Sequence, residues 1–145
     1  MDARTLSLPI STLGYKQPAT VQVGSPLSDA IDIMQVEGFG CVLVVDTEQR
    51  LVGILTDRDL LGHVCGKRLD PANVNVEEIM TANPESLRAS DPIAFALNLM
   101  HLGHFRHVPL CIWDDQNQEF PIGLISTRDI LDHVAIFIES QEGGA

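Results

Sequence analysis

The pattern of apolar and polar residues predicts the order strand, helix, strand, strand, helix in the first half of the chain. Alternation and short apolar runs indicate the strands, and apolar residues at helical spacing indicate the helices. Ser25 suits an N-cap and Pro26 the first helical position. The predicted strands cover residues 19–23, 41–45 and 51–55, and the predicted helices run from Pro26 to Gly38 and from Thr56 to Gly66.

The second half of the chain repeats this order. Three landmarks return at a constant offset of 66 (84 − 18): Pro18, Pro26 and Met34 correspond to Pro84, Pro92 and Met100. Beyond the middle strand the offset is 70, so the second copy has four extra residues, which we place in the polar connection 114–119. A surface turn tolerates such an insertion.

One stretch is repeated most clearly. Gly53-Ile54-Leu55-Thr56-Asp57-Arg58-Asp59 returns, at an offset of 70 (123 − 53), as Gly123-Leu124-Ile125-Ser126-Thr127-Arg128-Asp129. Each copy predicts a buried strand that ends in a hydroxyl residue and continues into a helix. The hydroxyl and the acid three residues later fit a capping box, in which each side chain bonds a backbone N–H. Capping by itself accounts for the motif.

The same stretch also suits a ligand. A strand that runs into a helix N-terminus presents free N–H groups and a positive dipole to a phosphate. Asp59 or Asp129 can accept two hydrogen bonds from a ribose diol, and Arg58 and Arg128 offer forked donors for phosphate oxygens. Capping does not require the arginine. Its duplication in a chain with only seven arginines favours the ligand.

The two copies are too small to be independent domains. Units of about 60 residues rarely bury enough surface to stand alone, so we expect the copies to pack across a pseudo-twofold axis with functional clefts at their junction. The expected class is α/β (α+β). We place the first repeat at 8–66, a linker at 67–73, the second repeat at 74–138, and flexible termini at 1–7 and 139–145.

Composition narrows the classes of function. A formal charge of −11 and a pI near 4.6 argue against binding to nucleic acid or to anionic membranes. The apolar runs are too short to span a bilayer and no secretory leader is apparent, so we expect a cytoplasmic protein. Three cysteines without a Cys-x-x-Cys pair, Cys41, Cys65 and Cys111, indicate neither a disulfide framework nor a zinc site.

The histidines and the missing catalytic motifs point away from a metal site and from an enzyme. We expect no metal at His101, His104 and His107, because a glycine interrupts that helix and no acid completes a ligand set. We expect His63 and His133, four residues after the two aspartates, to contact them. No nucleophile elbow or phosphate-binding loop occurs in the sequence, so we expect no catalysis.

Taken in order, these features resemble a tandem pair of cystathionine β-synthase (CBS) domains, the Bateman module. The resemblance covers residues 8–138. It rests on the proline-initiated helices, on both Gly-x-x-[Ser/Thr]-x-x-Asp segments, and on two further stretches: Ile79-Met80-Thr81 before Asn83-Pro84, and Arg106-His107-Val108-Pro109-Leu110. Each feature is weak singly, but the duplicated set is specific.

The resemblance implies a nucleotide site in each copy. It assigns the ribose to Asp59 and Asp129, with Thr56 and Ser126 beside them. Adenine is expected near Tyr15 and Val52 in one site, and near Thr81, Val108, Pro109 and Ile122 in the other. Arg58, Arg106, His107 and Arg128 complete the predicted nucleotide-binding set.

The two copies differ in ways that bear on binding. Arg106-His107 in the second copy replaces Gly40-Cys41 in the first and adds donors for phosphate. The lead-in Ile79-Met80-Thr81 matches the family pattern, whereas Leu13-Gly14-Tyr15 does not. We therefore expect the site at Asp129 to be the occupied one and the site at Asp59 to be the emptier one.

The implied function is that of a stand-alone regulatory module. It would bind AMP, ADP or ATP, with Mg²⁺ as a candidate bridging ion and without a catalytic cofactor, in the cleft between the repeats, and transmit a conformational change to a partner that the sequence does not indicate. Two alternatives stay open: a structural or dimerisation module with vestigial pockets, and an S-adenosylmethionine sensor. A homodimer is expected through helical faces that carry Leu60, Leu61, Val64, Ile130, Leu131, Val134 and Ile138.

Overall fold

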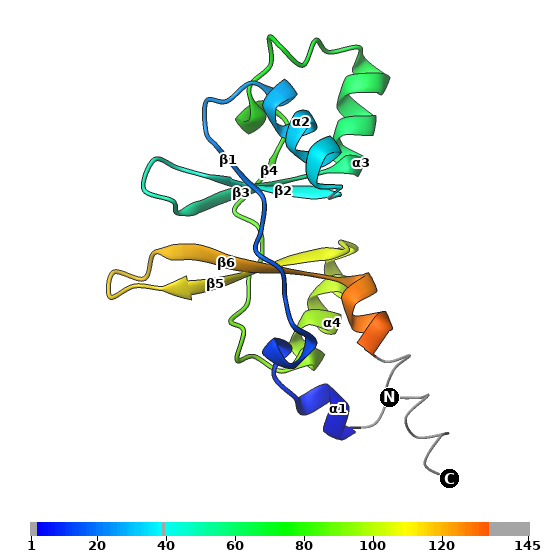
Figure 1. Ribbon diagram of the computed structural model, residues 1–145, viewed down its shortest axis with the longest axis vertical. Helices are drawn as coiled ribbons and strands as arrows, with labels where there is room; N and C mark the ends of the chain where they lie inside the picture. The colour runs from blue at the N-terminus through cyan, green and yellow to red at the C-terminus, as the bar shows by residue number, and fades with distance from the viewer. Residues whose placement is uncertain (1–2, 39, 134–145) are drawn as a thin grey trace. The chain divides into compact units, whose positions relative to one another are not determined.

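The computed structural model describes residues 3–38 and 40–133 (Figure 1). The predictions for residues 134–138, including Val134 and Ile138, and for the tail 139–145 therefore lie outside the described residues. The helices are α1 (Ala3–Ser7), α2 (Leu27–Glu37), α3 (Asp57–Leu60), α4 (Ile93–Gly103), the 3₁₀ helices η1 (Ile10–Leu13) and η3 (Val76–Glu78), and the π-helical η2 (Leu61–Cys65). The strands are β1 (Thr20–Gln22), β2 (Cys41–Val45), β3 (Leu51–Thr56), β4 (Thr81–Ala82), β5 (His107–Trp113) and β6 (Glu119–Ser126). Residues 127–133 are helical as well.

The described chain divides into two compact units, and neither unit is one continuous repeat. Residues 18–38, 40–84 and 112–121 form one unit, which we call the Asp59 unit. Residues 3–17, 85–111 and 122–133 form the other, the Asp129 unit. Each unit therefore takes in a lead-in segment that the expected boundaries give to the other repeat. The expected mixed α and β class is confirmed.

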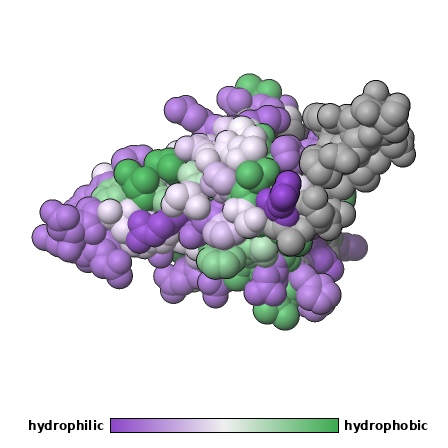
Figure 2. Space-filling model, turned by 90° about the horizontal axis from the view of Figure 1, so that it is seen from below, coloured by the Kyte–Doolittle hydropathy of each residue, from purple (hydrophilic) through white to green (hydrophobic). Residues whose placement is uncertain are grey.

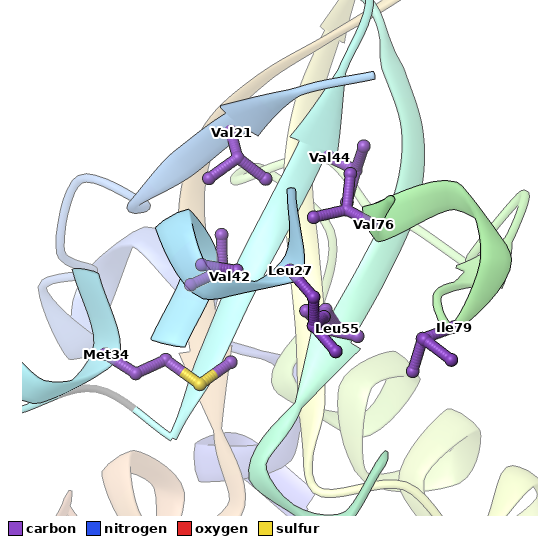
Figure 3. Packing of buried hydrophobic residues seen from close by; sticks show 9 residues of the cluster. Val21, Leu27, Met34, Val42, Val44, Leu55, Val76 and Ile79 are labelled. Carbon is purple, nitrogen blue, oxygen red and sulfur yellow. The ribbon is translucent and has the colours of Figure 1, made fainter. Parts of the chain in front are cut away.

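The Asp59 unit contains a four-stranded sheet in the order β1-β2-β3-β4. The β1 strand runs parallel to β2, whereas β2–β3 and β3–β4 are antiparallel. Every residue of β2 is buried, because both of its neighbours are strands and α2 packs on the sheet through Leu27, Ala30 and Met34. Figure 3 shows Leu27 and Met34 from α2 beside Val42, Val44 and Leu55 from the sheet, with Val76 and Ile79 closing the core.

The start of α2 differs from the expected cap. Pro26, in extended conformation, precedes the helix, and no side chain caps it, so the prediction of Ser25 as N-cap is wrong. Backbone carbonyls replace it: Leu27 N–H donates to Val74 O at 2.7 Å, and Ser28 N–H donates to Pro71 O at 3.0 Å. These bonds satisfy N–H groups that have no partner within the helix. Pro71 of the expected linker and Val74, the first residue of the expected second repeat, thus cap the helix.

The Asp129 unit contains residues 107–111 of β5 and 122–126 of β6, two strands that pair as a hairpin. Its core combines Ile10 of η1 with residues of α4, of the hairpin and of the last helix: Ile93, Ala96, Met100, Val108, Leu110, Ile125 and Ile130. The outer edge of β6 is bridged by Lys16, and that of β5 by Leu87. Residues 3–7, expected to be flexible, form α1, which contacts α4, and Thr5 is only 3% exposed.

The four extra residues of the second copy lie in its strands. Asp46 Oδ1 accepts hydrogen bonds from the backbone N–H groups of Glu48 and Arg50, each at 2.9 Å. Asp114 Oδ1 accepts the equivalent bonds from residues 116 and 118, at 3.0 and 2.8 Å. Both turns therefore have the same size, and the prediction of a longer surface turn is wrong. Strands β5 and β6, with seven and eight residues, are each two residues longer than β2 and β3.

The described surface agrees with the acidic composition. Figure 2 shows a face on which hydrophilic residues predominate and apolar residues form small, separate patches. Among the described residues, no helix combines the length and the apolar character that a membrane span requires.

Candidate functional site

The end of β3 and the start of α3 form a complete capping box. Thr56 Oγ1 accepts a hydrogen bond from Asp59 N–H at 3.3 Å. In return, Asp59 Oδ2 accepts bonds from Thr56 N–H at 2.9 Å and from the Thr56 hydroxyl at 3.0 Å. The capping interpretation of this stretch is therefore confirmed.

The end of β6 repeats the same geometry. Ser126 Oγ accepts from Asp129 N–H at 3.1 Å, and Asp129 Oδ2 accepts from Ser126 N–H at 2.8 Å and from the Ser126 hydroxyl at 2.9 Å. The same three bonds thus form in both units, and the bond from the aspartate N–H is the longest of the three in each. We call these two places the Asp59 junction and the Asp129 junction.

Capping uses only one oxygen of each aspartate. An ionised carboxylate offers about four lone-pair positions, and the box occupies two of them on Oδ2. Within residues 3–38 and 40–133, no donor bonds Oδ1 of Asp59 or Asp129. Both side chains are half-buried, so Oδ1 is held in a fixed direction while it stays accessible. The same aspartate can thus cap its helix and accept two hydroxyl donors from a ligand.

The arginine that precedes each aspartate is exposed. In the described part of the chain, the guanidinium groups of Arg58 and Arg128 make no ion pair. Neither arginine is therefore committed to a described carboxylate, and both can contact an anionic group.

The lead-in segments are exchanged relative to the grouping expected from the sequence. Thr81 of β4 pairs with Ile54, two residues before Thr56, so it belongs to the Asp59 junction. Lys16 bridges Leu124, two residues before Ser126, and thus occupies the equivalent position at the Asp129 junction. Within its own unit, Thr81 therefore lies beside the Asp59 junction, and the segment that contains Tyr15 lies beside the Asp129 junction.

The register of the lead-ins also explains the motif glycines. A Cβ atom on Gly53 would overlap the thioether of Met80, and one on Gly123 would overlap the ring of Tyr15. Tyr15 is therefore the counterpart of Met80. A constant offset of 66 would instead pair Tyr15 with Thr81. The glycines are needed because a side chain from the lead-in lies directly on the strand.

The predicted apolar contacts divide into two groups. Tyr15 and Ile122 are half-buried and pack against the core of the Asp129 unit, and Val52 does the same in the Asp59 unit. Val108 is 0% exposed within a core cluster, and Pro109 is also buried. Val108 thus supports the site from within the core, because its side chain presents no surface to a ligand.

The residues that lie before β2 and β5 reach the two junctions through matching backbone bonds. Asp57 N–H donates to Gly40 O at 2.9 Å, and Thr127 N–H donates to Arg106 O at the same distance. Arg106 is exposed and His107, the first residue of β5, is half-buried. Gly40 and Arg106 thus occupy equivalent positions beside the two capping boxes.

Cys41 follows Gly40 and reports on its surroundings. Burial raises the pKa of the Cys41 thiol to about 12, and the nearby carboxylates of Asp57 and Asp59 act in the same direction. Cys41 faces Thr56 across the β2–β3 pair. The thiol is therefore neutral at physiological pH, in a negative environment.

The histidines take no part in the two capping boxes. In the described chain, His63 and His133 make neither a hydrogen bond nor an ion pair with the aspartates, so that expectation is wrong. His63 lies in η2, where the wider π-helical turn changes the spacing of side chains. His104 ends α4 in the left-handed conformation. No group of three potential metal ligands occurs among the described residues.

Lys16 is the site residue that the sequence did not reveal. It is exposed, makes no ion pair with any described residue, and is placed at the Asp129 junction by its bridge to Leu124, near the other end of the chain. The only signal in the sequence was the basic residue that follows Tyr15, whose partner strand could not be inferred from local spacing.

The family follows from this duplicated architecture and is shown by comparison with known proteins. The sequence matches the CBS domain over residues 10–66 and 76–136, so the chain belongs to the CBS domain family. It is 43% identical over 70 residues to the CBS domain-containing protein CBSCBSPB1 of Arabidopsis thaliana, and this match covers 48% of the chain but only 13% of that relative.

Solved structures share the fold. A CBS domain protein from Pyrobaculum aerophilum, complexed with AMP, has a TM-score of 0.77 at 21% identity, over 91% of this chain and 97% of that one. The CBS domain pair of protein MJ0100, in complex with 5′-methylthioadenosine and S-adenosyl-L-methionine, has a TM-score of 0.75 at 22% identity, over 88% and 95% of the two chains.

Proposed function

We propose that this CBS domain pair is a regulatory module that binds AMP, ADP or ATP at its capping-box junctions and passes the effect of binding to a partner protein. The observation that carries the proposal is the free Oδ1 of Asp59 and of Asp129. Each is held by its box, stays open to the two hydroxyl donors of a ribose, and belongs to a residue next to an exposed arginine. The solved relative that holds AMP supports the choice of ligand.

The remaining predicted residues take supporting roles in this proposal. Arg58, Arg106, His107 and Arg128 would contact phosphate, with Mg²⁺ as a candidate bridge between phosphates and nearby carboxylates. The apolar groups Tyr15, Val52 and Ile122 would lie towards adenine, and Thr81 towards the ligand of the Asp59 junction. A ligand changes the state of a partner only if it binds one arrangement of the module better than another, so regulation here requires no catalysis.

A homodimer through helical faces belongs to the same proposal. Leu61 and Leu131 are equivalent residues, one turn into the helices that follow the junctions, and they are 66% and 61% exposed. Ile130 is 1% exposed and Leu60 and Val64 pack on the core, so only part of the predicted face is available. Sedimentation velocity of Leu61→Glu and Leu131→Glu tests it: a dimer that persists in both variants would contradict this interface.

Thermal unfolding with AMP, ADP, ATP and S-adenosylmethionine, each with and without Mg²⁺, tests the ligand. A ligand at about 100 times its Kd adds roughly 2.7 kcal/mol to the free energy of unfolding. We expect Asp59→Ala and Asp129→Ala to remove the contribution of their own junctions. Asp46→Ala and Asp114→Ala are the matched controls, because each removes a carboxylate that accepts backbone hydrogen bonds in a turn outside the two junctions.

The same experiment distinguishes two other functions. Complete capping boxes would also exist in a purely structural module, and the absence of any ligand-induced shift would establish that alternative. The second candidate function is a sensor of S-adenosylmethionine, because a solved relative is in complex with that ligand. If only S-adenosylmethionine stabilised the protein, and Arg58→Ala and Arg128→Ala had no effect, the nucleotide proposal would fail.

A further inference from the structure

The two junctions match in their capping but differ in charge at three equivalent positions. Lys16 at the Asp129 junction stands where Thr81 stands at the Asp59 junction, as their pairing with Leu124 and Ile54 shows. Asp57 N–H donates to Gly40 O at the Asp59 junction, and Thr127 N–H donates to Arg106 O at the Asp129 junction, both at 2.9 Å. Arg106 is therefore equivalent to Gly40, and Thr127 is equivalent to Asp57. Each exchange makes the Asp129 junction more positive by one charge.

We propose that these exchanges give the two junctions different ligand classes, with Lys16 and Arg106 as specificity-determining residues. The Asp129 junction selects an adenosyl ligand that carries a di- or triphosphate. The Asp59 junction, with Asp57, favours an adenosyl ligand with fewer phosphates, from AMP down to the nucleoside itself. This inference rests on the proposed function and assigns a substrate class to each of its sites.

The strand geometry places the lysine on the same side of the sheet as the capping hydroxyl. Directly paired residues in antiparallel strands project to the same face, and residues two apart along a strand do so as well. Lys16 therefore shares a face with Leu124 and Ser126. Ile125, between them, is 0% exposed and points into the core. Lys16 thus projects from the same face as the hydroxyl that holds Asp129.

The local balance of charge is opposite at the two places. Lys16, Arg106 and Arg128 belong to the Asp129 junction, where Asp129 is the capping carboxylate. At the Asp59 junction, Arg58 accompanies two carboxylates, Asp57 and Asp59. Burial is the main cause of the raised pKa of the adjacent Cys41 thiol, and the carboxylates of Asp57 and Asp59 raise it further.

This difference matters because the chain as a whole is acidic. A net charge of −11 disfavours a polyphosphate everywhere except where cations are concentrated. Additional phosphates gain charge-assisted hydrogen bonds beside Lys16 and Arg106, and meet like charge beside Asp57. A neutral nucleoside gains no binding energy from Lys16 and Arg106, and Asp57 does not repel it.

Isothermal titration with ATP and with adenosine tests the proposal, with Asp59→Ala and Asp129→Ala backgrounds to isolate each junction. In the Asp59→Ala background, we expect Lys16→Thr and Arg106→Gly each to weaken ATP binding by about tenfold and to leave adenosine binding unchanged. In the Asp129→Ala background, Asp57→Thr should tighten ATP binding by a similar factor. These substitutions install the residue found at the other junction.

Lys67→Thr is the matched control, because Lys67 is an exposed lysine outside both junctions and its substitution removes the same charge. An equal effect of Lys67→Thr and Lys16→Thr on ATP binding, or equal changes for ATP and adenosine, would overturn the assignment and leave the proposed function intact. If the wild-type protein bound neither ATP nor adenosine nor S-adenosylmethionine, the proposed function would fall and this inference with it.

Discussion

The Asp59 and Asp129 units present the same strand-to-helix junction in different surroundings. Their capping bonds join the same atoms in both units, yet a methionine covers the motif glycine in one and a tyrosine in the other. The charges beside the two boxes also differ. The start of the helix thus constrains the hydroxyl and the acid in both copies. The neighbouring positions, which capping does not use, are free to diverge in ligand preference.

The largest expected effect concerns the core residue inside each junction. Leu55 and Ile125 are equivalent, and both are 0% exposed. We expect Leu55→Ala and Ile125→Ala each to lower the free energy of unfolding by about 2–5 kcal/mol, because each leaves a cavity beneath its strand. Urea denaturation measures this loss. A negligible cost for one of the two would show that the units are not equivalent in their cores.

A smaller effect distinguishes the two glycines. Gly123→Ala forces a methyl group against the rigid ring of Tyr15, at an expected cost of about 1–3 kcal/mol. Gly53→Ala should cost less, because the flexible Met80 side chain can rotate away. Urea denaturation of both variants ranks them. Tyr15→Ala added to Gly123→Ala should recover part of the loss, and a double variant without recovery would contradict the contact.

The smallest effect concerns Cys41, whose counterpart in the Asp129 unit is His107. The folded state raises the thiol pKa from 9.0 to about 12, so the stability that this group contributes is fully present below pH 9.0. The contribution is lost as the pH rises from 9.0 and is gone at about 12. Between about pH 8 and pH 10 we expect a loss of about 1.4 kcal/mol that Cys41→Ala lacks, measured by urea denaturation. The same pH dependence in wild type and variant would rule out this cause.

Local patterns predicted the elements and the capping boxes because the residues that determine them are adjacent. Thr56 and Asp59 are three residues apart, as are Ser126 and Asp129, and backbone geometry brings them together without tertiary help. The order of strands and helices followed from apolar spacing for the same reason.

The sequence could not predict features that depend on distant backbone partners. The cap of α2 comes from the carbonyls of Pro71 and Val74, and no pattern near Ser25 indicates them. The counterpart of Tyr15 was misassigned by one residue, because Asn83, at φ 50°, adds a residue before Pro84 that the other lead-in lacks. Lys16 was missed because its partner, Leu124, lies in the last strand of the chain.

The exchange of lead-in segments sets the order in which the chain can complete its parts during synthesis. The four-stranded sheet of the Asp59 unit has all its strands once residue 82 has emerged. Residues 3–17 emerge first, but the segments against which they pack begin at residue 85 and extend past Leu124. Because the ribosome releases the N-terminal end of a chain first, residues 3–17 are thus among the last segments to pack into their unit.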